Sequence, residues 1–134
     1  MSRGVRLGGA PTDAGPPNAG MPNAAPVLFV AAAASYAANC ALGGAVWMRL
    51  LDTSRFRWVH HALYIATCAL AVAAGSSALW DRQRRSVQAA TLILAPAAVP
   101  LAAIPYAGTH GWRHPLIALT AAPFFLGAAI RSRR

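Results

Sequence analysis

Four long apolar stretches, separated by short polar segments, restrict this chain to one class of fold. They extend over about residues 26–48, 58–80, 87–107 and 112–130. A helix needs about 20 apolar residues to cross a hydrocarbon core about 30 Å thick, and each stretch is close to that length. The sequence therefore predicts an all-α integral membrane bundle of four antiparallel transmembrane helices, because short connections force neighbouring helices to run in opposite directions.

The composition agrees with a membrane protein better than with a soluble domain. Hydrophobic residues make up 57% of the 134 residues and charged residues 11%, whereas a soluble domain carries about 25% charged residues. Residues 1–25 differ from the rest, because they are rich in Gly, Pro and Asn and show no apolar period. We predict a disordered cytoplasmic tail over 1–25 and a four-helix transmembrane domain over 26–134.

The basic residues, all of them arginines, are distributed unevenly between the two sides of the predicted bundle, and the net charge is +9. The side with both termini carries Arg3, Arg6, Arg82, Arg84, Arg85, Arg131, Arg133 and Arg134, and the other side carries Arg49, Arg55, Arg57 and Arg113. The positive-inside rule then predicts that both termini lie in the cytoplasm, and together with the composition we expect a bacterial inner-membrane protein. The absence of Lys and the abundance of Ala are typical of actinobacterial-like composition. Because the arginines flank apolar stretches, they predict contact with anionic lipid and not with nucleic acid.

The acidic residues lie outside the apolar stretches. Asp13 is in the tail, while Asp52 and Asp81 are in the connections. Ion-coupled transport usually requires an ionisable group at membrane depth, so this pattern disfavours a coupled transporter. The sequence also shows no nucleophile–base pair and no paired carboxylates, and we predict that the chain is not an enzyme.

Four histidines fall on one predicted side of the membrane, opposite the termini. His60 and His61 begin the second stretch, and His110 and His114 lie near the start of the fourth. Imidazole is a common ligand for metals and haem, so His61 and His114 are candidates to hold haem b or a transition metal, with His60 and His110 as further metal ligands. The alternative, which we favour, is that these are ordinary interfacial residues and no cofactor binds.

Small and polar residues indicate how the first two helices pack. Asn39 and Gly43 lie one helical turn apart in the first stretch, while Tyr64, Cys68 and Gly75 share an arc of the second. Small residues allow membrane helices to approach closely, so we expect these two faces to pack together. Asn39 is expected to find a hydrogen-bond partner there, because an unpaired amide is costly in hydrocarbon.

Prolines interrupt the last two stretches. Pro96 and Pro100 lie four residues apart in the third stretch, and Pro123 lies in the fourth. Each proline removes a backbone hydrogen bond, and we predict kinks at these positions.

These features leave three functional interpretations. The first, which we favour, is a structural or interaction subunit that packs against a larger membrane complex or against copies of itself. The second is a redox protein that binds haem or a metal through the histidines. The third is a carrier or channel for a neutral solute, with the proline-interrupted third helix lining the path.

Overall fold

The computed structural model describes residues 24–51, 57–81, 84–106 and 113–134, and the regular elements in these ranges are helical. The helices are α1 (Ala24–Trp47), α2 (Arg57–Trp80), α3 (Arg85–Leu94), α4 (Ala98–Ala103), α5 (Arg113–Thr120) and α6 (Ala122–Ser132). Short 3-10 turns, η1 (Ala95–Ala97) and η2 (Ile104–Tyr106), follow α3 and α4. The prediction of an all-helical chain is confirmed for the described residues.

Four helical segments are long and apolar enough to cross a membrane, as the sequence predicts. They are Ala24–Trp47, Trp58–Trp80, Arg85–Tyr106 and Arg113–Ser132. The first begins slightly before the predicted boundary, at Ala24, so α1 includes the end of the predicted tail. Residues 1–23 of that tail lie outside the described residues. Four segments of this length and hydropathy suit a membrane protein.

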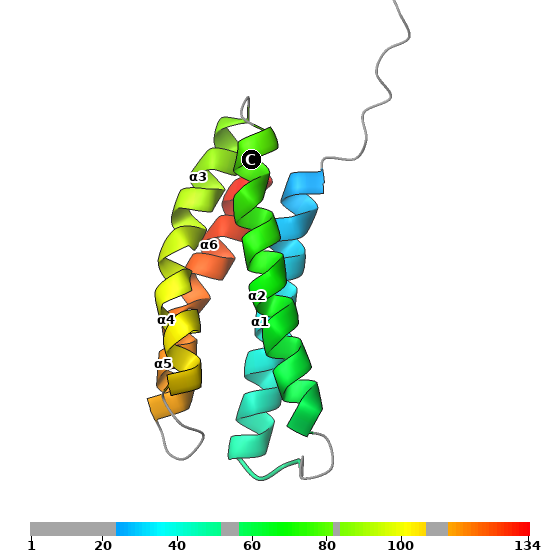
Figure 1. Ribbon diagram of the computed structural model, residues 1–134, viewed down its shortest axis with the longest axis vertical. Coiled ribbons are helices and arrows are strands. Elements are labelled where there is room, and N and C mark those ends of the chain that lie inside the picture. Colours follow the sequence, from blue (N-terminus) through cyan, green and yellow to red (C-terminus); the bar gives the residue numbers. More distant parts are fainter. Residues whose placement is uncertain (1–23, 52–56, 82–83, 107–112) are drawn as a thin grey trace, which may run out of the picture.

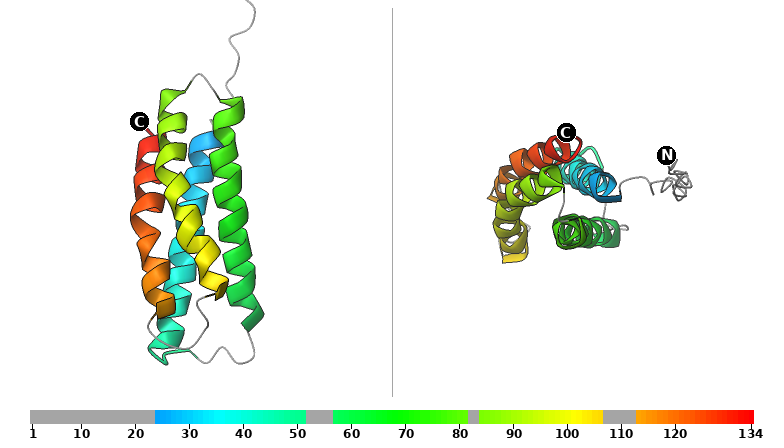
Figure 2. Two further views of the ribbon diagram at one scale, coloured as in Figure 1. Left: turned by 60° about the vertical axis from the view of Figure 1, so that its left-hand side comes forward. Right: turned by 90° about the horizontal axis from the view of Figure 1, so that it is seen from above.

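The four segments lie side by side in an elongated bundle (Figure 1, Figure 2). The most extensive contacts join α1 to α2 and α3 to α6, and α1 also packs against α6. Pro26, Arg84 and Arg133 gather at one end, which we call the arginine end. The helices α2 and α5 begin at the opposite end, which we call the histidine end because His60 and His114 lie in their first turns.

The apolar core lies mainly in the half of the bundle nearer the arginine end. Phe29 of α1, Val87 of α3 and Phe125 of α6 each expose at most 1% of their surface. Towards the histidine end, no residue of α1 after Tyr36 and no residue of α5 is buried to this degree. In α1 and α5, the half nearer the histidine end is therefore the less buried half of the bundle.

The α-helices of the third and fourth segments are interrupted near two of the three prolines where kinks are predicted, whereas the third, Pro100, lies within α4 and does not interrupt it. Pro96 lies in η1 between α3 and α4, and Pro123 is the second residue of α6, just after α5 ends. Because proline has no N–H, the carbonyl four residues before it loses its helical partner. Each break therefore creates a backbone acceptor that another group has to satisfy.

Two tyrosines supply donors near these breaks. The Tyr64 hydroxyl donates a hydrogen bond to the carbonyl oxygen of Leu101, 2.8 Å away. In a regular helix the N–H of residue 105 would serve that carbonyl, but residue 105 is Pro105. The Tyr36 hydroxyl donates to the carbonyl of Ala118 near the end of α5, which also accepts the backbone N–H of Ala121, so this bond joins α1 to α5 and does not replace a bond lost to proline. Membrane helices tolerate proline where neighbouring helices satisfy the freed backbone groups, and the bond from Tyr64 to Leu101 does so here.

Candidate functional site

Three helices bring an imidazole pair together at the histidine end. The rings of His60 in α2 and His114 in α5 have centroids 6.4 Å apart, and their planes are inclined by 49°. Gly43 of α1 lies beside them, since a Cβ atom added there would be 3.8 Å from Cε1 of His60. The pair is therefore enclosed on one side by the α1 backbone.

Two buried polar atoms in this half have no hydrogen-bond partner among the described residues. They are Nδ1 of His114 and Oδ1 of Asn39. Asn39 precedes Gly43 by four residues and so lies on the same face of α1, one turn nearer the core. An unsatisfied buried polar atom costs about 1–3 kcal/mol, and such atoms often mark the position of a water or an ion.

The unpaired Asn39 oxygen corrects the expectation that this amide finds a partner between the first two helices. The bond that joins α1 to α2 is made one turn earlier, where the hydroxyls of Ser35 and Thr67 lie 2.8 Å apart. Thr67 donates its own proton to the carbonyl of Leu63, 2.8 Å away, so Ser35 is the donor to Thr67. Asn39 lies where α1 carries no fully buried residue, and helix packing there presents no partner to its oxygen.

The histidine near His114 is His60, and not His61 as the sequence suggested. His61 is exposed, and its ring centroid is 6.3 Å from that of His60. Neighbouring residues of a helix point about 100° apart, so the rotation that brings His60 to α5 turns His61 outward. The fourth histidine, His110, lies outside the described residues.

The described residues supply few candidate metal ligands at this site. Within the described ranges, no group of three or more His, Cys, Asp or Glu side chains is arranged to hold a metal ion. A closed structural zinc site has four such ligands. His60 and His114 could therefore contribute two ligands to a metal, with the other positions left to other groups.

Two of the packing residues chosen from the second stretch contact the third segment, which was not the predicted partner. Tyr64 bonds to α4 through Leu101, and Gly75 faces α3, where a Cβ atom would lie 4.0 Å from Cγ2 of Thr91. Cys68 is partly buried with a free thiol, consistent with a small packing residue. The arc of α2 predicted to contact α1 therefore reaches α3 and α4, while Thr67 makes the bond to α1.

The outward surface of α1 has a property that the sequence analysis did not identify. Between Val27 and Val46, its exposed residues include no large hydrophobic side chain. The residues of highest exposure there are Ala34, Ala37, Ala38 and Ala41, which we call the alanine face. The other segments expose larger side chains, such as Val72, Val99 and Leu126. Alanine is so frequent in the first stretch that its sequence gives no clear period to identify this face.

Comparison with protein families, with curated proteins and with solved structures gives no match for this chain. Its own residues and geometry are therefore the basis for a functional proposal.

Proposed function

We propose that the chain is a bacterial inner-membrane protein whose four antiparallel spans leave both termini in the cytoplasm. The arginine distribution supports this orientation, because the side with the termini carries the larger share of basic residues. The arginine end then faces the cytoplasm and the histidine end faces the opposite side. This orientation sets the surroundings in which each site acts.

Within that membrane, we propose that the protein is an interaction subunit that packs against transmembrane helices of a larger complex or of its own copies. The alanine face of α1 carries this proposal. Lipid tails are as apolar as the side chains of a membrane helix, so the hydrophobic effect does not drive such helices together. They associate instead through close packing of small residues. A continuous surface of alanines allows another helix to approach the α1 backbone closely, whereas the larger exposed side chains of the other segments suit contact with lipid.

The interior of the bundle supports a structural role over transport. The partly buried hydroxyls donate to other helices or to backbone carbonyls. Ser35 bonds to Thr67, and the two tyrosines, Tyr36 and Tyr64, bond to backbone carbonyls, so these polar groups hold the helices together. The acidic residues of the sequence all lie outside the spans. The hydroxyl bonds favour a scaffold over a neutral-solute carrier or channel, and the position of the acids disfavours an ion-coupled transporter.

A photoreactive amino acid placed in the membrane-embedded chain tests this proposal. We expect the probe at Ala38 to form covalent adducts with another protein chain, because a partner helix covers the alanine face. The probe at Ala69 is the matched control, since Ala69 is an exposed alanine of α2 that lies between the large exposed residues Ile65 and Val72. That position should give lipid adducts.

The adducts are identified by gel shift and mass spectrometry. Adducts with the same chain indicate self-association, and adducts with a second protein indicate a larger complex, so both support the proposal. If the probe at Ala38 yields lipid adducts alone, or if both positions yield the same proteins, the alanine face is not a binding surface.

As a second candidate function, we propose that His60 and His114 bind a transition-metal ion such as copper. Two imidazoles on opposite sides of one ion, each with a nitrogen about 2 Å from it, place their ring centres about 6 Å apart. The observed separation of 6.4 Å is close to that value, and Nδ1 of His114 is unpartnered. Gly43 lies against His60, so the α1 backbone bounds the space beside this ring, and we propose a single ion rather than haem.

A further inference from the structure

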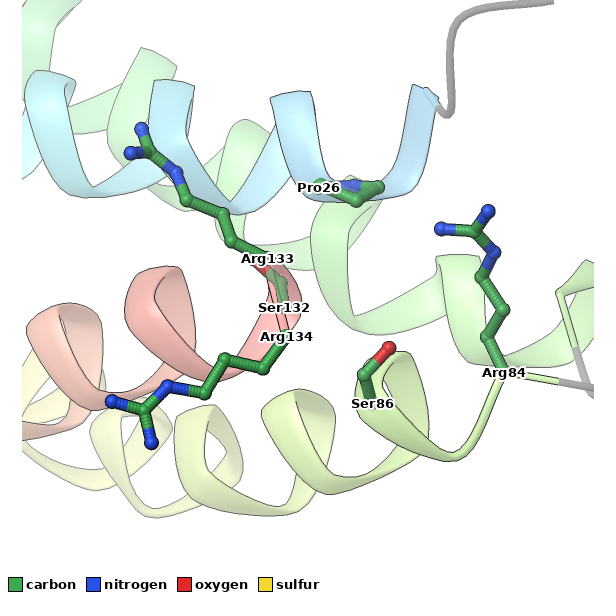
Figure 3. Close-up of a pocket in the computed structure, with 6 residues that line it drawn as sticks. All are labelled: Pro26, Arg84, Ser86, Ser132, Arg133 and Arg134. Atoms are coloured by element: carbon green, nitrogen blue, oxygen red, sulfur yellow. The ribbon is translucent and has the colours of Figure 1, made fainter. Parts of the chain in front are cut away.

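An open pocket of about 520 Å³ at the arginine end is formed by three separate parts of the chain (Figure 3). The start of α1, the start of α3 and the end of α6 contribute its lining residues, which are Pro26, Arg84, Ser86, Ser132, Arg133 and Arg134. In Figure 3 the side chains of Arg84 and Arg133 extend towards α1, and the Ser86 hydroxyl points into the space between α1 and α3. We call this space the arginine pocket.

The arginine pocket carries an excess of positive charge. Three arginines line it, and the acidic side chain paired with one of them among the described residues is Asp81, whose Oδ2 lies 3.7 Å from Nε of Arg84. Both partners of that pair are partly exposed, and exposed ion pairs at such distances interact weakly. Arg133 and Arg134 are exposed and lie in no ion pair within the described chain. Most of the positive charge is therefore available to an anion.

An apolar groove adjoins the arginine pocket. A second pocket of about 200 Å³ shares Pro26 and Arg133 with the first and is otherwise lined by Val27 and Val30 of α1. A ligand that occupied both pockets would place a negative group among the arginines and a hydrocarbon chain along α1. The pockets lie where the apolar spans end, which in a bilayer is the level of the headgroups.

We propose that the arginine pocket and its groove bind an anionic phospholipid, with the phosphate among the arginines and one acyl chain along Val27 and Val30. Guanidinium groups match phosphate oxygens with paired hydrogen bonds, which makes arginine the favoured residue for this recognition. Ser86 adds a hydroxyl donor close to the start of α3, where free backbone N–H groups also favour an anion. The groove lies on the same side of α1 as the alanine face and directly precedes it, so the acyl chain reaches the edge of that face, whereas the histidine pair lies at the other end of the bundle.

The test is native mass spectrometry of the full chain in mild detergent, titrated with phosphatidylglycerol or with phosphatidylcholine of the same acyl chains. We expect phosphatidylglycerol to bind about tenfold more tightly, because the charge-assisted bonds to its phosphate are not opposed by a choline cation. Arg133→Gln should lower the affinity for phosphatidylglycerol about tenfold. Arg131→Gln is the matched control, since it removes the same charge from an exposed position on α6 that does not line the pocket.

Two further experiments distinguish a bound lipid from a bound free phosphate and test the apolar groove. Inorganic phosphate and glycerol phosphate should fail to displace phosphatidylglycerol at equal concentration, because they lack the acyl chain. Val30→Trp should weaken phosphatidylglycerol binding by filling the groove, with unchanged helicity by circular dichroism. Displacement by glycerol phosphate would overturn the lipid assignment in favour of a free anion. Equal losses for Arg131→Gln and Arg133→Gln, or equal binding of both lipids, would show general charge attraction and overturn the site.

Discussion

A Gly127→Leu variant should lose about 2–3 kcal/mol of unfolding free energy, the cost of overpacking a tight helix–helix contact. Gly127 lies in α6, where a Cβ atom would sit 3.1 Å from Cγ2 of Ile93 in the third segment. That distance is below ordinary van der Waals contact, so a leucine has to displace the Ile93 side chain or separate the two helices. The contact between α3 and α6 is among the most extensive in the bundle, and its loss should be visible as a lower midpoint in detergent-induced unfolding.

Gly44→Leu provides the matched control for that change. Gly44 is also a helical glycine, but a Cβ atom there would have no neighbour within 4 Å. The same substitution should therefore change the unfolding free energy by less than about 0.5 kcal/mol. The double variant Gly127→Leu/Ile93→Ala should recover part of the loss, since it removes the opposing methyl group. Equal destabilisation at both glycines would mean that α6 does not approach Ile93 closely.

Copper binding at the histidine pair should depend on His60 and His114 and not on His61. Either His60→Ala or His114→Ala is expected to weaken binding of one copper ion per chain by more than about 100-fold, since even loss of a group supporting a ligand costs about 10–100-fold. Metal analysis and competitive titration of the purified protein measure this effect. The two variants remove ligands on different helices, so a shared loss links binding to the pair.

His61→Ala is the control for the copper measurement. It removes a neighbouring imidazole of the same helix, but that ring is exposed and faces away from α5. Its copper affinity should equal that of the unmodified chain. A folded, unmodified protein that retains no copper after titration and desalting would contradict the proposal. A larger loss of copper affinity for His61→Ala than for His60→Ala would also contradict it.

The four spans follow from the sequence because their signal is length and hydropathy, which do not depend on how the helices face one another. The prolines likewise act locally, and the breaks at Pro96 and Pro123 lie where the sequence predicts them. In contrast, the choice between His60 and His61 depends on the rotation of α2. That rotation is fixed by contacts with other helices, such as the Ser35–Thr67 bond, and a uniformly apolar helix gives little periodic signal from which to infer it.

The two surfaces proposed to bind other molecules depend on tertiary structure. The alanine face is defined by which alanines the bundle leaves exposed, and alanines occur on every side of α1. The arginine pocket combines Pro26, Arg84 and Arg133, which are far apart in the sequence. The sequence predicts that arginines meet anionic lipid, but it does not predict that three of them line one pocket beside an apolar groove.

Native mass spectrometry of the protein, extracted from its own membrane in mild detergent, tests the proposed interaction role most directly. We expect a complex heavier than the 13.9 kDa of one chain. Ala38→Leu should release the single chain, because the larger side chain separates the alanine face from its partner, whereas Ala69→Leu should leave the complex intact. A single chain of 13.9 kDa before any substitution, under conditions that keep other membrane complexes assembled, would contradict the account.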